Sequence, residues 1–539
     1  MPRNNAPGPF HEDESGQTMI IVGLMVTVLL GFMGLVADVG WLQIGIVRAQ
    51  RAADAAALAG APYLPGNVGG ATTAARNEAT KNGFTHNVNG ASVLVAQDPL
   101  NPNLLNVTVS ATVRTFMSNL FGVPSFQTSR NARAEFILPV PMGSPQAYYG
   151  IYKLCVDGGT CSTINDPSGT AIPSQGFWGA VISYDGNRGN GDLYSTHNNG
   201  AGVTNAYYDA NGYQYIVEFP TGTTNGLVRI FDAPYCATGK DNTGGQQQLG
   251  TGDHWIGGNG AVTTQYILWN TMGTPYDTTD DVQIADDGGL FTNQKQVDKG
   301  AAYGGNRAYG GTVNSGNYDS GSPKTYADCQ SDPYHNAWWT INALAPINAG
   351  GQYRLQVKTS SPNNVGTNAE NMFGIMATQT APGLSTNPHV YGQSRMCDYV
   401  NVVAGDQLFY LAQIASVHAG KTLQITVHDP GDVGGSAYLK FEQPGSGGYS
   451  DATFSWSATN GTSGNNVTQL QVASGGSSLF DNQIVTILIP LSTSYTAVAP
   501  AGEPGPGWWK VLYHVTGAGN DTATWAVTIR GNPVHLIVP

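Results

Sequence analysis

The sequence carries little charge. Lys, Arg, Asp and Glu make up 11% of its 539 residues, and 23 basic residues face 36 acidic ones, which gives a net charge of −13. Soluble globular domains usually contain about 25% charged residues. Because nucleic-acid binding needs clustered Lys and Arg against the phosphates, the composition excludes a nucleic-acid partner. It also argues against a cytosolic metabolic enzyme.

Cysteine is scarce, and strong catalytic motifs are missing. None of the 5 Cys residues forms a Cys-x-x-Cys pair, and the His residues are scattered, so a zinc site is not expected. The chain has neither a Gly-x-Ser-x-Gly elbow nor a His-Glu-x-x-His helix. We therefore predict that the protein is not an enzyme and needs no cofactor, with calcium as the one candidate ligand.

Long apolar runs are also rare, since only Met19–Ala37 is long and free of charge. At 1.5 Å per residue it forms roughly 28 Å of helix, enough to cross one hydrocarbon core. A cleaved signal sequence has a shorter apolar region, with a small-residue cleavage site just beyond it. Here the nearest small-x-small tripeptide, Ala57–Ala59, lies too far on. We predict an uncleaved transmembrane helix after a cytoplasmic tail, residues 1–18.

Two signals for the orientation of this helix disagree. Arg3 precedes the helix, whereas Arg48 and Arg51 follow it, and basic residues normally stay in the cytoplasm. Long domains cross the membrane largely regardless of such charges. The low charge of the remaining chain suits the exterior. We predict a single-pass protein of the bacterial cytoplasmic membrane, with its N-terminus inside and its bulk extracytoplasmic.

The helix is expected to continue past the membrane. No Pro occurs between Asp38 and Pro62, and Ala residues dominate the second half, so one helix is predicted over residues 18–60. Gly23, Thr27 and Gly31 recur every four residues and share a face. Small residues on one face let membrane helices approach closely. These three are the candidate helix-packing residues.

The segment Gly16–Ala61 resembles the N-terminal segment of TadG-like proteins of the tight-adherence (Flp) pilus system. The resemblance is carried by an apolar span ending in Asp38-Val39-Gly40, by Trp41 and Arg48, and by the string Ala52–Ala61. It implies a membrane-anchored protein associated with pilus assembly, in a structural or adhesive role. The implied partners are the membrane and other pilus-assembly membrane proteins or prepilins.

The resemblance extends to about residue 138. A helix over 71–82, a strand over 105–113, a short helix over 115–122 and a strand over 125–138 look like the family's first extracytoplasmic module. Two family features are missing. Ile21 stands where prepilin processing after Gly16 needs Glu, and Asp319–Ser322 departs from the metal loop of a von Willebrand factor A-type domain.

From Pro139 onward, short strand-like runs alternate with Gly, Asn, Asp, Ser and Pro turns. This pattern is typical of antiparallel sandwiches. The predicted fold class is therefore α+β and membrane-anchored: a single N-terminal transmembrane helix with a small α+β module, then predominantly antiparallel β-sandwich domains. The predicted domains are the tail 1–18, the transmembrane helix 19–37, the stalk and module 38–138, and two β-rich extracytoplasmic domains, 139–347 and 348–539.

Carboxylate-rich turns are the candidate calcium sites, because Gly-rich loops let Asp and Asn oxygens converge on a cation. The alternative is ordinary turns, in which these oxygens bond their own backbone. A further acidic pair is Asp429 with Asp432. The candidate ligands in the first two turns are Asp185, Asn187, Asn190, Asp192, Asp277, Asp280 and Asp281.

Cys155 and Cys161 flank a Gly-containing turn and are the candidate disulfide, which would suit an oxidising exterior. Six Trp residues offer a platform for stacking sugars or, alternatively, fill the cores of the sandwiches. The alternative function is accordingly an extracytoplasmic carbohydrate- or matrix-binding protein that contacts surface polysaccharide, with a hydrolase as a further alternative. The Trp residues are Trp178, Trp255, Trp338, Trp339, Trp508 and Trp509.

Overall fold

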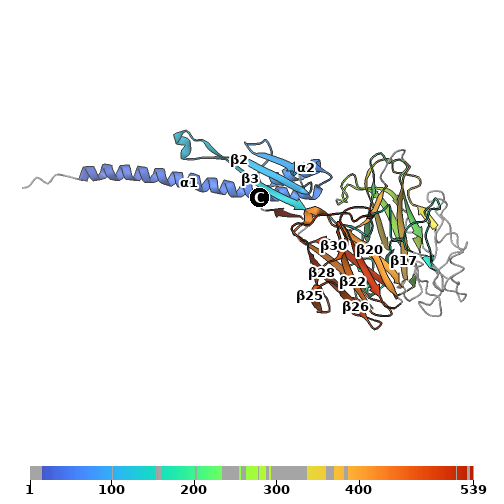
Figure 1. Ribbon diagram of the computed structural model, residues 1–539. Coiled ribbons are helices and arrows are strands. Elements are labelled where there is room, and N and C mark those ends of the chain that lie inside the picture. The colour runs from blue at the N-terminus through green and yellow to red at the C-terminus, as the bar shows by residue number, and fades with distance from the viewer. Residues whose placement is uncertain are drawn as a thin grey trace, which may run out of the picture. The chain divides into compact units, whose positions relative to one another are not determined.

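The chain folds into two compact units in a computed structural model (Figure 1). The N-terminal unit contains residues up to Ile137 and the last strand of the chain, and the β unit is Leu138–Gly531. The structure describes residues 15–99, 101–152, 154–155, 161–200, 203–232, 254–255, 263–276, 278–286, 291–292, 337–359, 369–380, 387–402, 404–517, 519–530 and 534–537.

The N-terminal unit is built on one long helix, α1 (Ser15–Gly60), which confirms the predicted continuous helix. Its first half is exposed and apolar, whereas the second half packs against a sheet in the order β1-β2-β3-β31. Figure 1 shows β2, β3 and α2 beside this second half. The elements that follow α1 are η1 (Ala61–Tyr63), α2 (Val68–Lys81), β1 (Ser92–Gln97), β2 (Leu104–Arg114), η2 (Ser118–Phe121), β3 (Ser125–Phe136) and β31 (Val534–Ile537).

The second half of α1 packs closely because its inward face carries only small side chains. Buried Ala residues recur at helical spacing, and Gly60 faces the backbone of α2. A Cβ at Gly60 would lie 2.7 Å from the carbonyl oxygen of Ala71 and 2.5 Å from Leu105. The helix is therefore part of the core of this unit. The fully buried Ala residues are Ala49, Ala52, Ala53, Ala56 and Ala57.

We expect Gly60→Val to destabilise the N-terminal unit by about 2 kcal/mol, because overpacking a close contact forces backbone shifts. Hydrogen exchange of the β2 amides, in the full chain in detergent, measures this loss. Gly31→Val is the matched control, since it places the same side chain in the same helix at a position with nothing within 4 Å. Equal protection of β2 in both variants would contradict the packing described.

The predicted domain 348–539 is wrong for the last strand of the chain. β31 instead pairs antiparallel with β3, with Phe136 opposite Val534 and Arg133 opposite Ile537. It completes the sheet of the N-terminal unit. The β unit is thus an insertion between two neighbouring strands. The chain leaves the N-terminal unit after Ile137, one residue before the predicted boundary.

Among its described residues, the β unit contains one sheet of twelve strands and one of thirteen, paired antiparallel throughout. The first runs β15-β10-β17-β8-β19-β30-β21-β28-β24-β25, with β5 and β11 beside β17. Its strands are β15 (Ala337–Thr340), β10 (Leu227–Asp232), β17 (Ala369–Thr378), β8 (Trp178–Ile182), β19 (Arg395–Val402), β30 (Gly519–Ile529), β21 (Thr422–His428), β28 (Ile484–Pro490), β24 (Phe454–Ala458), β25 (Ser463–Val467), β5 (Tyr148–Tyr149) and β11 (His254–Trp255).

The second sheet runs β13-β12-β16-β9-β18-β4-β20-β29-β22-β26-β27, with β14 beside β12 and β23 beside β22. A separate hairpin pairs β6 (Leu154–Cys155) with β7 (Cys161–Ser162). The strands of the second sheet are β13 (Val282–Asp286), β12 (Thr263–Asn270), β16 (Gly351–Thr359), β9 (Tyr213–Phe219), β18 (His389–Gln393), β4 (Pro141–Met142), β20 (Gly405–Gln413), β29 (Trp508–Val515), β22 (Ala437–Gly445), β26 (Leu470–Ser474), β27 (Ser477–Ser478), β14 (Phe291–Thr292) and β23 (Gly448–Asp451).

The two sheets pack face to face and form the predicted sandwich architecture. Tyr215 on β9 meets Phe373 on β17 with ring centroids 6.0 Å apart, and Phe409 on β20 meets Trp525 on β30 at 5.9 Å. The predicted division at 347/348 falls inside this unit. β9 and β16 lie on opposite sides of it, yet they pair from Tyr213–Val357 to Phe219–Gly351.

Candidate functional site

The candidate site lies in the N-terminal unit, where the apolar half of α1 meets η2. Asp38 directly follows the apolar run and is 3% exposed. Its carboxylate accepts the backbone N–H of Phe116 at 2.7 Å and that of Ser118 at 2.6 Å. Burial alone would raise the pKa of Asp38, but these backbone hydrogen bonds outweigh it and hold the pKa below its ordinary value. The ionised carboxylate therefore fixes the η2 loop to the helix.

Glycine in α1 lets this loop come close. Gly34 lies one helical turn before Asp38, and a Cβ atom at Gly34 would overlap the side chain of Met117. The loop ends at Gly122, which adopts a left-handed conformation with φ 82°. The predicted helix end at Gly122 is thereby confirmed, although the helix itself is a single 3₁₀ turn.

An open groove lies beside this junction, between α1, the end of α2 and β2. It has a volume of about 890 Å³, and its lining includes Trp41, Arg48, Arg114 and Phe116. The Trp41 and Phe116 rings meet edge to face with centroids 6.1 Å apart, and the Arg48 guanidinium lies 5.9 Å from the Trp41 ring. Aromatic and basic side chains thus gather at the end of the apolar run.

The candidate helix-packing residues lie in the first half of α1. Thr27 donates its hydroxyl to the carbonyl oxygen of Gly23 at 2.9 Å, and a Cβ at Gly23 or Gly31 would have nothing within 4 Å. The structure leaves this face open. Its packing against another helix stays a prediction.

Asp192 is the last candidate ligand in the first predicted calcium turn. Its side chain is fully buried, and its carboxylate already accepts hydrogen bonds from the protein. Its carboxylate accepts the backbone N–H groups of Ile182, Tyr194 and Ser195 and the hydroxyl of Tyr213. Burial raises the pKa of Asp192 despite these bonds.

In the rest of this turn, the Asn187 side chain bonds the backbone of its own turn. Asn187 caps η3 (Arg188–Asn190) by accepting the N–H of Gly189, and the backbone carbonyl of Asp185 accepts the amide of Asn198. Asn190 lies at the end of η3. Of the four side chains, those of Asn187 and Asp192 are therefore engaged in hydrogen bonds within the protein, and calcium binding by this turn stays a prediction.

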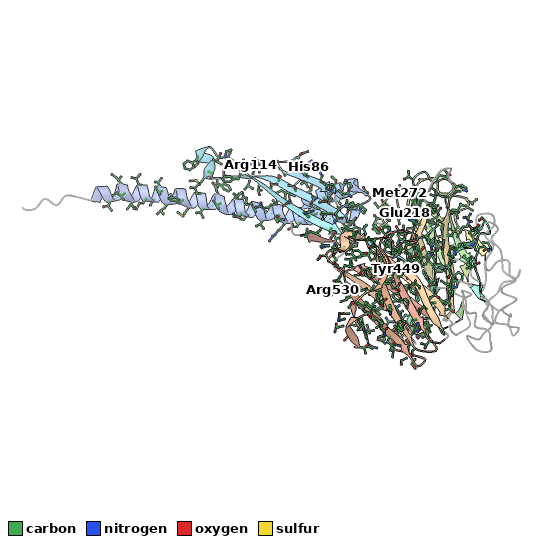
Figure 2. All side chains as sticks on the ribbon, viewed as in Figure 1. His86, Arg114, Glu218, Met272, Tyr449 and Arg530 are labelled. Atoms are coloured by element: carbon green, nitrogen blue, oxygen red, sulfur yellow. The ribbon has the colours of Figure 1, made fainter. Side chains whose placement is uncertain are left out.

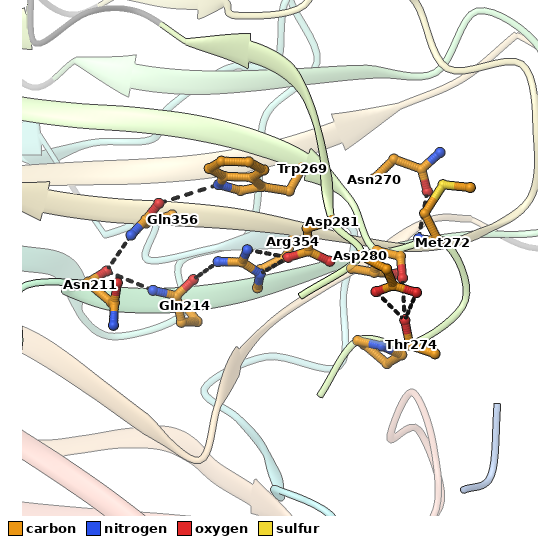
Figure 3. A network of polar contacts seen from close by, with 12 residues as sticks. Asn211, Gln214, Trp269, Asn270, Met272, Thr274, Asp280, Asp281, Arg354 and Gln356 are labelled. Atoms are coloured by element: carbon orange, nitrogen blue, oxygen red, sulfur yellow. Dashed lines mark hydrogen bonds and ion pairs between the residues drawn. The ribbon is translucent and has the colours of Figure 1, made fainter. Parts of the chain in front are cut away.

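The second turn is held by a polar network on β12 and β16 (Figure 3). Asp280 accepts the hydroxyl of Thr274 at 2.8 Å, and Asp281 pairs with Arg354, whose Nε lies 3.0 Å from Oδ2 of Asp281. The Arg354 side chain is 7% exposed and the Asp281 side chain 3%. Asp277 lies outside the described residues.

The pair Asp429 and Asp432 belongs to a carboxylate cluster that the sequence did not indicate in full. Asp521 joins it from β30, and its carboxylate accepts the N–H of Gly431 and the hydroxyl of Tyr513. Burial and the neighbouring Asp432 raise the pKa of Asp521 to about 7. Within the described part of the chain, no three His, Cys, Asp or Glu side chains gather as a metal site requires.

Cys155 and Cys161 stand opposite each other in the β6–β7 hairpin. Opposed residues of antiparallel strands have Cα atoms about 4.5–5.5 Å apart, within the range that a disulfide spans. We expect both thiols to escape alkylation in protein isolated without reductant, and to react after reduction, as read by peptide mass. Alkylation of Cys155 before reduction would contradict this. Cys236 and Cys329 lie outside the described residues.

Most of the Trp residues named for a sugar platform fill the core. Trp178 and Trp509 are fully buried, and Trp339 and Trp508 are 8% and 4% exposed. Trp178 stacks on Phe231 with centroids 5.7 Å apart. Trp338 is half-buried and donates its ring N–H to the carbonyl oxygen of Asn165.

No curated protein and no solved structure matches the chain. The Tad family model, which describes TadE/G-like proteins of Flp pilus assembly, matches residues 16–62. The matched stretch coincides with α1 and η1, and so contains both the apolar half of the helix and the Ala-rich half that packs in the N-terminal unit. The chain therefore carries a TadE/G-like N-terminal module of the Flp pilus-assembly type.

Proposed function

We propose that this protein is a membrane-anchored component of the tight-adherence (Flp) pilus system that holds the β unit outside the cytoplasmic membrane in a structural or adhesive role. The observation that carries the proposal is the family match over residues 16–62. That stretch contains the one helix, among the described residues, that is long and apolar enough to cross a membrane.

The architecture supports a scaffold. The same helix enters the bilayer and forms the core of the N-terminal unit, so the module is joined rigidly to its anchor. Both connections to the β unit leave from neighbouring strands, β3 and β31. Two adjacent connections of this kind suit a large unit that must stay attached when mechanical force acts on it.

A non-catalytic role is part of the proposal. A pocket of about 340 Å³ beside β5 and β17 has one carboxylate, Asp166, in its lining. This carboxylate accepts the N–H groups of Ser168 and Thr170 in its own turn. Glycoside hydrolysis needs two carboxyl groups about 5–10 Å apart, so this pocket does not favour a hydrolase.

Deleting the coding sequence and imaging pili tests the proposal. We expect the deletion to reduce surface pili or adhesion, and the wild-type chain to restore them. Unchanged pili and unchanged adhesion would contradict the proposal.

Copurification tests the link to the assembly machinery. The wild-type chain should recover inner-membrane pilus components, and Gly23→Leu with Gly31→Leu should lose them, because bulky side chains block close helix approach. The matched control is Leu24→Ile with Leu30→Ile, which keeps the helix apolar and leaves the Gly face intact. Equal recovery in all three would count against the packing face.

A further inference from the structure

The η2 loop exposes a group of large apolar side chains. We call residues 116–123 the apolar tip. Phe116 is 65% exposed, Leu120 74% and Phe121 73%. Clustered exposed apolar side chains mark interaction or membrane surfaces, whereas single ones are ordinary. The tip therefore needs a partner that accepts apolar side chains.

The position of the tip indicates what that partner is. Asp38 binds the N–H groups of Phe116 and Ser118, and Met117 lies against Gly34. The tip is thus held beside the last turn of the Met19–Ala37 run, at the depth where α1 leaves the hydrocarbon core. The apolar side chains of α1 at this level are exposed as well. Val36, for example, is 72% exposed. The exposed apolar side chains of the tip therefore extend the apolar surface that α1 presents.

The charges around the tip agree with a bilayer surface. No residue between Arg114 and Arg130 is charged. Arg114 is exposed at the base of the loop, as Figure 2 shows, and Trp41 and Arg48 lie in the adjoining groove. Trp and Arg are the side chains that place an apolar body in lipid and a polar end at the headgroups.

We propose that the apolar tip inserts into the lipid leaflet beside α1, so that the N-terminal unit has a second contact with the bilayer. The partner is the acyl-chain and headgroup boundary of the membrane itself. This inference rests on the proposed membrane anchoring by α1. Asp38 and Gly34 are the positioning residues, since Asp38 bonds the backbone of the loop and Gly34 leaves room for Met117.

Photo-crosslinking in proteoliposomes of phosphatidylethanolamine and phosphatidylglycerol tests the proposal. The full chain carries benzoylphenylalanine in place of Phe121 or, in a second variant, Leu120, and lipid adducts are measured by mass. Leu94 is the matched control, because it is apolar and 59% exposed on β1. It stands opposite Thr108, about 20 Å along β2 from Arg114. Leu29 in α1 reports on the anchor.

We expect lipid adducts from Phe121, Leu120 and Leu29, several-fold above those from Leu94. Adducts from Leu29 with neither tip position above Leu94 would overturn the insertion and leave the anchor intact. Adducts of the tip with protein in place of lipid would also overturn it. Absence of lipid adducts from Leu29 would contradict membrane anchoring by α1. Both this inference and the proposed function would then be wrong.

Discussion

Arg354→Ala should lower the free energy of unfolding of the β unit by about 3–5 kcal/mol, the cost of breaking a buried ion pair. The guanidinium pairs with Asp281, donates to Gln214 at 2.6 Å and lies 5.4 Å from the Trp269 ring. Removing it leaves the Asp281 carboxylate buried without its cation. Urea unfolding followed by Trp fluorescence measures the loss.

Lys440→Ala is the control for this prediction. Lys440 pairs with Asp451 at 2.6 Å, but their side chains are 26% and 37% exposed. Such a pair contributes less than about 1 kcal/mol. Equal midpoints for the two variants would contradict the claim that the Arg354 network of Figure 3 holds β12, β16 and β9 together.

Asp521→Asn should change the pH dependence of the stability of the β unit. The folded pKa of Asp521, about 7, lies above its ordinary value of 3.8. The folded state therefore binds more protons between these values, and stability from this group is present at low pH and lost as pH rises toward 7. Between pH 5 and pH 8 the loss is about 2–3 kcal/mol. The side chain introduced by Asp521→Asn does not ionise, so this variant should not show that loss of stability.

The measurement is the difference in unfolding free energy between variant and wild type at pH 5 and pH 8. A difference is needed because other groups titrate too. Burial lowers the pKa of His428 to about 4, so this residue opposes the trend by destabilising the fold as pH falls. Between pH 5 and pH 8, we expect the unfolding free energy of Asp521→Asn to rise relative to that of the wild type by about 2–3 kcal/mol. A difference independent of pH would contradict the raised pKa.

Local patterns in the sequence predict several elements of the N-terminal unit, although neither β1 nor β31 is among them. The uncharged run and the Ala-rich stretch predict α1, alternation predicts β2, and Gly122 predicts the end of η2. These elements depend on residues close to each other in sequence. The predicted sandwich class followed in the same way, from short alternating runs between turns.

Long-range pairing could not be predicted. No local feature shows that β31 joins β3, or that β16 pairs with β9 across the predicted division. The same holds for the site. The sequence shows Asp38 only as part of a family string, because the amides that its carboxylate binds lie 78 and 80 residues away. The sequence alone does not distinguish Gly34 from Gly31, since they differ in the contact that Met117 makes with Gly34.

The most direct test of the central claim, that α1 crosses the membrane and holds the β unit outside, is thiol labelling in spheroplasts. Ser446→Cys places a thiol at an exposed position between β22 and β23, and Asn5→Cys places one before α1. Label is counted above that of the wild-type chain, whose own cysteines set the background. A membrane-impermeant maleimide should add such label to the Ser446→Cys chain in intact spheroplasts, and to the Asn5→Cys chain only after permeabilisation. The reverse pattern, or added label on both variants in intact spheroplasts, would contradict the account.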